Sequence, residues 1–166
     1  NGFGKLFIFD SNQKKNLVRY IGNFKNNKFD GKGTERYGDD YYITGTFRHG
    51  FIVGKATEFY MDGKVKFEGT FDKCGRRDGN GTENYKSGNI EKKGKYEKGR
   101  LIQGTTYYDN ENNSVSYKGT FRKFRGSPLK GTSYWVNGRK KEEGIWDGGF
   151  RKGKKFREDG KGYEEG

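Results

Sequence analysis

The chain has 166 residues and a formal net charge of +13, and only 28% of its residues are hydrophobic. This composition excludes a conventional core of leucine, isoleucine and valine, and low hydrophobicity with high net charge is typical of disordered chains. However, 17% of the residues are aromatic, and the 29 glycines are accompanied by a single proline, which is unlike a flexible linker. We therefore expect the glycines to have fixed structural positions.

Several other classes of protein are excluded by the sequence. No apolar run approaches the roughly 20 residues needed to span a bilayer, and no signal peptide is visible, which predicts a soluble protein. The single cysteine, Cys74, excludes an internal disulfide framework and is predicted to be a free thiol in a reducing compartment. The sequence begins with Asn1, within a motif, so we expect it to be part of a longer chain.

Two short motifs alternate along the chain from Gly2-Phe3-Gly4 onward. The first is Gly-x-aromatic, whose glycines follow one another at steps of 23, 24, 25, 25 and 25 residues. Its copies are Gly22-Phe24, Gly45-Phe47, Gly69-Phe71, Gly94-Tyr96, Gly119-Phe121 and Gly144-Trp146. The second is Gly-x-Gly or a variant, at Gly31-Gly33, Gly54-Ala56, Gly79-Gly81, Gly104-Thr106, Gly131-Ser133 and Gly160-Gly162. Such regular self-similarity indicates a repeat architecture.

Both motifs are predicted to be β-strands. With a side-chain period of two, Tyr117, Gly119 and Phe121 share one face, and Lys118 and Thr120 point the other way. The predicted aromatic and glycine face consists of Tyr20, Gly22, Phe24, Gly31, Gly33, Tyr37, Gly45, Phe47, Phe67, Gly69, Phe71, Gly79, Gly81, Tyr85, Gly94, Tyr96, Tyr117, Gly119, Phe121, Trp135 and Trp146.

Turn signals connect these strands. Asp62-Gly63, Ser87-Gly88 and Asn137-Gly138 follow strand ends, and Asp-Gly and Asn-Gly favour the turns that match strand twist. The chain is therefore predicted to be all-β, a succession of antiparallel hairpins. Glycine weakens a strand unless another group must approach the backbone closely. We expect aromatic rings to lie over these glycines.

The motifs resemble the MORN repeat (membrane occupation and recognition nexus). The best copy runs from Tyr20-Ile21-Gly22-Asn23-Phe24 to Gly31-Lys32-Gly33-Thr34-Glu35-Arg36-Tyr37. The resemblance covers a single repeat domain, residues 1–166, made of a half repeat (1–19) and repeats 20–42, 43–66, 67–91, 92–116, 117–141 and 142–166.

Some repeats depart from this pattern. Ala56, Thr106 and Ser133 stand in place of the second glycine, and the closing aromatics Tyr108 and Trp135 lie further forward than expected. Lys92 and Glu142 occupy the place of the leading aromatic. The phrase Asn137-Gly138-Arg139-Lys140 is similar to a bacterial antitoxin-like variety of the repeat, so the subfamily stays open.

The resemblance implies an elongated, twisted, single-layer antiparallel meander with an aromatic groove for binding or assembly. Members of the family occur in ciliary radial spokes, in parasite cytoskeletons, at membrane junctions, and beside lipid kinase or methyltransferase domains. The repeats themselves are not catalytic. A cytoplasmic protein of a cytoskeletal or ciliary assembly is the implied setting.

The residue types needed for catalysis or for metal binding are scarce. His49 and Cys74 fall at expected turns, and one residue of each cannot form a zinc site. Adjacent carboxylates such as Asp39-Asp40 point to opposite faces of a strand. We predict no enzymatic activity, no small-molecule substrate, no metal and no cofactor.

Positive charge is concentrated in the second half of the chain. Residues 1–83 hold 15 basic and 11 acidic residues, a net of +4, whereas residues 84–166 hold 20 and 11, a net of +9. The candidate anion-binding residues are Lys92, Lys93, Lys95, Arg122, Lys123, Arg125, Arg139, Lys140, Lys141, Arg151, Lys152, Lys154 and Lys155. They are interpreted either as a solvated face or as a site for anionic lipid, an acidic protein or, third in order, single-stranded nucleic acid.

Three functions follow as hypotheses. The first is a structural scaffold whose groove takes a peptide or helix of another protein. The second is a peripheral membrane module that binds anionic phospholipids through the basic residues, although the sequence shows no exposed apolar anchor. The third is a targeting arm of a larger enzyme.

Overall fold

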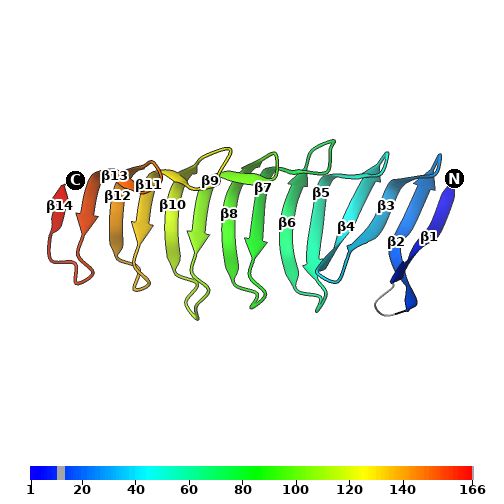
Figure 1. The fold of residues 1–166 in the computed structure, drawn as a ribbon, viewed down its shortest axis with the longest axis horizontal. Coiled ribbons are helices and arrows are strands. Elements are labelled where there is room, and N and C mark those ends of the chain that lie inside the picture. Colours follow the sequence, from blue (N-terminus) through cyan, green and yellow to red (C-terminus); the bar gives the residue numbers. More distant parts are fainter. Residues whose placement is uncertain (11–13, 166) are drawn as a thin grey trace. The chain divides into compact units, whose positions relative to one another are not determined.

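Short strands alternate with tight turns along the whole described chain. The computed structural model describes residues 1–10 and 14–165. These residues form one open antiparallel sheet of 14 strands, in which the order of the strands follows their order in the sequence (Figure 1). The described residues contain no helix. The predicted all-β meander of consecutive hairpins is therefore confirmed.

The strands have the following bounds: β1 (Gly2–Asp10), β2 (Lys15–Lys25), β3 (Lys28–Tyr37), β4 (Tyr41–Arg48), β5 (Phe51–Tyr60), β6 (Val65–Phe71), β7 (Arg77–Asn84), β8 (Ile90–Glu97), β9 (Arg100–Tyr107), β10 (Val115–Phe121), β11 (Pro128–Tyr134), β12 (Lys140–Trp146), β13 (Phe150–Phe156) and β14 (Tyr163–Glu165). The chain divides into two compact units, Asn1–Arg77 and Asp78–Gly166, and each is described by itself.

A column of directly paired small residues crosses the strands of each unit. In the first unit the column is Gly4, Gly22, Gly33, Gly45, Ala56 and Gly69, and each member pairs with the next. In the second unit it is Gly81, Gly94, Gly104, Gly119, Gly131, Gly144 and Gly153. We call these columns the glycine ladder. A Cβ built on these residues would point to one face of the sheet, which we call the ladder face.

The ladder corrects the predicted alignment of the later repeats. Gly104 and Gly131 pair with Gly119, so Thr106 and Ser133 do not stand in place of the ladder glycine. With Gly104 and Gly131 as reference, Tyr108 and Trp135 follow the ladder by four residues, as Tyr37 follows Gly33. The closing aromatics of these two repeats are therefore regularly placed. The motif is ambiguous in these two repeats because each keeps a single glycine, which matches either position of Gly-x-Gly. The four-residue spacing to the closing aromatic and the cross-strand pairing both assign it to the second position.

The end of the chain is also paired differently from the prediction. Gly144 pairs with Gly153, and Gly160 lies in the turn after β13, where its amide donates to the carbonyl oxygen of Arg157. Gly160-x-Gly162 is therefore not the second strand of the last hairpin, which the motif pattern had predicted. The lysine-rich segment around Gly153 pairs with β12, with a register shift at Arg151 between the pairs Ile145–Lys152 and Trp146–Phe150.

Aromatic rings on the ladder face form the core of each unit. Tyr20, Phe47 and Phe67 are fully buried in the first unit. The ring of Tyr20 stacks on Phe29 at 3.7 Å between centroids and meets Phe47 edge-on at 5.1 Å. In the second unit Tyr117 meets Phe121 and Trp146 edge-on, at 5.0 and 5.4 Å. These are favourable aromatic geometries, and they replace an aliphatic interior.

Candidate binding surface

The predicted aromatic and glycine face lies on the ladder face, where most of its rings are used in packing. A Cβ built on Gly33 would lie 2.5 Å from Cζ of Tyr20, and one built on Gly119 would lie 2.7 Å from the Tyr117 hydroxyl. Rings thus lie directly over bare backbone in both units. Buried members are Tyr20, Phe47, Phe67, Phe71, Tyr96, Tyr117, Phe121 and Trp146; Phe24, Tyr85 and Trp135 are half-buried, and Tyr37 is exposed.

The hydroxyl groups of Tyr20 and Tyr117, whose rings cover ladder glycines, are hydrogen-bonded. The Tyr20 hydroxyl donates to the carbonyl oxygen of Asn23 at 3.0 Å, and the Tyr117 hydroxyl donates to that of Thr120 at 3.1 Å. The pKa of the Tyr117 phenol is raised to about 12. Burial is the larger effect and raises the pKa, whereas backbone hydrogen bonds with Leu129 and Lys130 partly offset this increase. This group therefore stays neutral through the physiological range.

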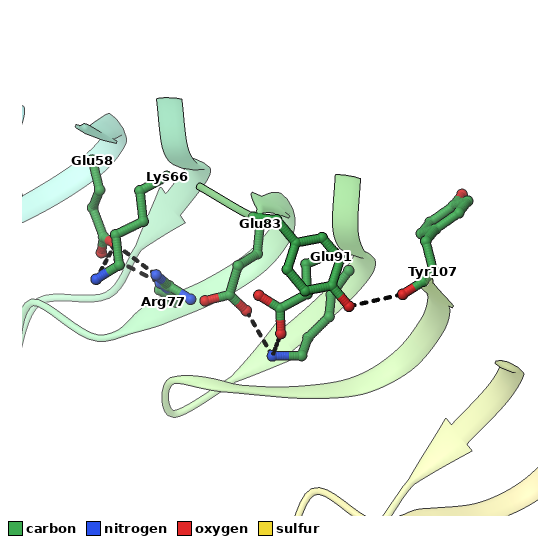
Figure 2. Close-up of polar contacts among 8 residues, drawn as sticks. Glu58, Lys66, Arg77, Glu83, Glu91 and Tyr107 are labelled. Atoms are coloured by element: carbon green, nitrogen blue, oxygen red, sulfur yellow. Dashed lines mark hydrogen bonds and ion pairs between the residues drawn. The ribbon is translucent and has the colours of Figure 1, made fainter. Parts of the chain in front are cut away.

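A buried carboxylate connects three strands of the first unit. Glu58 of β5 is 6% exposed and accepts hydrogen bonds from Nε and Nη2 of Arg77, at 3.3 and 2.5 Å (Figure 2). The ammonium of Lys66 lies 3.9 Å from the same carboxylate. The Arg77 guanidinium also lies over the ring of Phe67, at 4.0 Å. Two cations therefore balance one buried anion at this point of the ladder face.

A second buried carboxylate, Glu35 of β3, has different partners. It accepts a hydrogen bond from the Tyr37 hydroxyl at 2.8 Å, and Nη2 of Arg19 lies 3.4 Å from its other oxygen. Burial and the hydrogen bond to Glu35 raise the pKa of Tyr37. The ring of Tyr37 stacks on Tyr41, at 4.9 Å.

In the second unit the equivalent carboxylate binds a lysine. Lys92 of β8 lies 3.1 Å from Glu83 and 2.7 Å from Glu91, and Figure 2 shows both carboxylates directed at one ammonium group. Burial alone would lower the pKa of Lys92, but the hydrogen bonds and charges of the two carboxylates raise it. Lys92 is therefore charged, and with the two carboxylates it forms a group that has one net negative charge. Beside this group, the Tyr85 hydroxyl donates to the Tyr107 carbonyl oxygen at 2.9 Å.

The carboxylates Glu35, Glu58 and Glu83 were not among the predicted site residues. Their signal is a Thr-Glu pair directly after a ladder residue, as in Gly33-Thr34-Glu35, Ala56-Thr57-Glu58 and Gly81-Thr82-Glu83. The pair recurs three times at one position, which indicates a structural role on a face otherwise filled by rings.

The predicted anion-binding residues lie at several places in the second unit. By strand alternation, Lys92 and Lys155 belong to the ladder face, whereas Lys93, Lys95, Lys152 and Lys154 belong to the opposite face. Arg151 lies at the register shift between β12 and β13. Arg122, Lys123 and Arg125 lie in the turn after β10. Arg139, Lys140 and Lys141 lie around the start of β12.

Many of these basic side chains already have a partner. Arg122 and Arg151 contact Asp147 at 2.5 and 3.1 Å, Lys123 contacts Glu97 at 2.9 Å, and Lys140 contacts Glu143 at 2.8 Å. Arg139 donates to the Glu158 carbonyl oxygen at 3.1 Å. Lys141, Lys154 and Lys155 lie over the rings of Trp135, Tyr163 and Phe150. In the described chain Arg125, Lys93, Lys95 and Lys152 make no side-chain ion pair.

An exposed aromatic residue lies within the basic turn between β10 and β11. The side chain of Phe124 is 89% exposed, and Lys123 and Arg125 flank it in the sequence. The prediction that no exposed apolar anchor exists is therefore wrong. Phe121 is buried because it ends a strand and follows the strand's side-chain alternation. Phe124 lies in the turn that follows, where this alternation does not apply, so the sequence pattern does not predict its exposure.

The two residues considered for catalysis, His49 and Cys74, lie in turns between strands. His49 and Cys74 are exposed in different turns, and Nδ1 of His49 lies 3.9 Å from Asp30. Among residues 1–10 and 14–165, no three histidine, cysteine or acidic residues are grouped in a way that suits a metal ion. The same residues include no helix that is long and apolar enough to cross a membrane.

The comparison with known protein families agrees with the geometry. The model of the MORN repeat matches residues 20–40, 44–65 and 67–90, which extend from within β2 to the first residue of β8. No curated protein matches the chain.

Proposed function

Because residues 20–90 carry MORN repeats, we propose that this protein is a non-catalytic scaffold that binds another protein through its ladder face. MORN repeats are typically non-catalytic, and repeat modules generally mediate binding. The observation that carries the proposal is the open sheet of consecutive hairpins. With no helix among the described residues to cover it, this sheet leaves both faces available to a partner.

The proposed setting is a ciliary or cytoskeletal assembly in the cytoplasm, with a peptide or helix of the partner lying along the ladder face. The resemblance to repeats of such assemblies supports the setting. The exposed ring of Tyr37 supports a surface that offers aromatic contacts.

Isolation of the tagged native protein after cross-linking in its own cells tests this proposal. We expect one or more proteins to be recovered in a fixed stoichiometry and to cross-link to ladder-face residues. Recovery of the monomer alone would contradict the scaffold function.

A second candidate function, binding to an anionic membrane surface, is favoured by Phe124. An exposed ring between Lys123 and Arg125 combines an apolar insertion with charge attraction, and each basic residue near such a surface contributes about 1 kcal/mol. Flotation with vesicles containing phosphatidylserine tests it. We expect binding at low salt that weakens in Phe124→Ser and at high salt; no binding at low salt would eliminate this candidate.

The third hypothesis, a targeting arm of a larger enzyme, is supported by the occurrence of MORN repeats beside enzyme domains. It is decided by the coding sequence of the full gene, where a catalytic domain on the same chain is the expected finding.

A further inference from the structure

Two glycine pairs of the second unit, Gly94 with Gly104 and Gly144 with Gly153, lack a covering ring such as those of Tyr20 and Tyr117. The first of these pairs joins β8 and β9. Tyr20 and Tyr117 each lie two residues before a ladder glycine, and their hydroxyls are among the three nearest atoms to a Cβ built there. Before Gly94 the corresponding residue is Lys92. The three atoms nearest to a Cβ on Gly94 all belong to the backbone of Gln103 and Gly104, and those nearest Gly104 belong to the backbone of Lys93 and Gly94.

A hollow of about 450 Å³ lies beside this uncovered pair. Lys92 and Tyr96, which flank Gly94 on β8, line it together with Leu101 of β9 and Phe121 of β10. Tyr96, Leu101 and Phe121 are buried, so they present fixed apolar walls. Lys92 pairs with Glu83, which also lines the hollow, and with Glu91, so this group of one ammonium and two carboxylates has one net negative charge. The carboxylates of a ligand are therefore favoured beside the arginines and not beside Lys92.

Two guanidinium groups border the hollow without a protein partner. Arg100 begins β9 and Arg125 lies in the turn before β11; both are exposed and line the hollow. Within the described residues neither makes an ion pair. The half of the chain that carries them has a net charge of +9. An exposed guanidinium group without an ion-pair partner can bind a carboxylate through two parallel hydrogen bonds.

We propose that this hollow receives an aromatic side chain from an acidic segment of the partner protein, so that the partner supplies the ring that Lys92 replaces. Carboxylates that flank the ring pair with Arg100 and Arg125. The inference rests on the proposed protein-binding function and assigns it a position and a ligand class. Its support is the precedent of Tyr20 and Tyr117, whose rings each cover a pair of ladder glycines, together with the two arginines that line the hollow.

A synthetic peptide with one tryptophan flanked on each side by two glutamates is the probe, and calorimetry with the full chain measures its affinity. We expect the peptide to bind, and a version with alanine in place of tryptophan to bind at least about tenfold more weakly. Arg100→Gln with Arg125→Gln should also weaken binding by about tenfold or more, since charged hydrogen bonds are lost. Lys92→Tyr should fill the hollow with an internal ring and likewise weaken binding.

The matched control removes the same charge from the opposite face. Lys118 and Lys130 are exposed and alternate with the ladder residues Gly119 and Gly131, so Lys118→Gln with Lys130→Gln should change the affinity less than about twofold. Equal losses in the two double variants, equal affinity of the alanine peptide, or no binding of the tryptophan peptide would overturn the inference.

Two further outcomes separate this inference from the proposed function. A cross-linked native partner that binds the Lys92→Tyr and arginine variants as tightly as the wild type would refute the hollow while leaving the scaffold function intact. Loss of binding to phosphatidylserine vesicles in the arginine variant, without any binding of the tryptophan peptide, would assign Arg100 and Arg125 to a membrane surface instead.

Discussion

A glycine pair and the ring above it form the smallest unit of this structure. At Gly119 and Gly131 the two backbones lie so close that a Cβ on either residue would meet the Cα of the other at 2.7 Å. The Tyr117 hydroxyl oxygen lies 2.7 Å from a Cβ built on Gly119 and 2.8 Å from a Cβ built on Gly131. Glycine is therefore required here for space, and the ring gains contact with the peptide plane that any side chain would prevent.

Replacement of a ladder glycine should destabilise the protein far more than replacement of a glycine in open space. For Gly119→Ala we expect a loss of about 1–3 kcal/mol in the free energy of unfolding, because backbone atoms must separate. Gly149 has no atom within 4 Å of a built Cβ and no left-handed conformation, so Gly149→Ala should change stability by less than about 0.5 kcal/mol. Urea denaturation measures both, and equal effects would contradict ladder packing.

The phenol of Tyr117 should make stability depend on pH in the alkaline range. An unfolded tyrosine loses its proton near pH 10.0, whereas the folded Tyr117 keeps it until about 12. The contribution of the neutral Tyr117 phenol to the free energy of unfolding is therefore fully present below pH 10, and it is lost as the pH rises toward 12. Tyr117→Phe should cost about 1 kcal/mol at neutral pH. The stability difference between wild type and variant should shrink between pH 10 and 12; a constant difference would refute the assigned burial.

At the scale of the strands, ion pairs connect neighbouring hairpins on the ladder face. Glu58 of β5, Lys66 of β6 and Arg77 of β7 form one group, in which the side chains of Glu58 and Arg77 are 8% and 15% exposed. A buried charge that loses its partner is costly, although the intact pair contributes little net stability. The intact group is therefore expected to add little net stability, whereas loss of one member is costly.

Neutralising Glu58 should strongly destabilise the first unit. Removal of one partner from a buried pair costs about 3–5 kcal/mol, and because Gln retains some hydrogen bonding we expect a loss of about 3 kcal/mol in Glu58→Gln. Glu68 of β6 is exposed, so Glu68→Gln serves as the control and should have an effect below about 0.5 kcal/mol. Chemical denaturation followed by tryptophan and tyrosine fluorescence compares the two; similar midpoints would show that Glu58 is solvated.

At the scale of the whole molecule, the sequence predicts the architecture but only part of the surface. Its period of about 25 residues and the alternation around Gly119 are sufficient for an all-β meander, because each repeat presents the same local signals. The register at Gly104 and Gly131 was wrong by two residues, since the single glycine of each repeat matches either position of a Gly-x-Gly motif. Cross-strand pairing assigns it to the second position, where it faces another glycine.

The surface was less predictable for a related reason. The exposure of Phe124 depends on the conformation of a turn, and the pairing of Lys92 with Glu83 and Glu91 depends on contacts between adjacent strands. Neither the exposure of Phe124 nor the pairing of Lys92 can be predicted from the spacing of residues along one strand. The missing ring at Lys92 was visible in the sequence as a departure from the repeat, but the hollow that accompanies it was not.

The contacts between α-protons of paired ladder glycines test the central structural claim most directly. Two-dimensional nuclear Overhauser spectra of the labelled protein should show cross-peaks that connect Gly22 with Gly33, Gly94 with Gly104, and Gly119 with both Gly104 and Gly131. Aromatic protons of Tyr20 and Tyr117 should contact the same α-protons. Cross-peaks from Gly119 to the α-proton of Thr106 or Ser133 in place of those to Gly104 and Gly131 would contradict the glycine ladder.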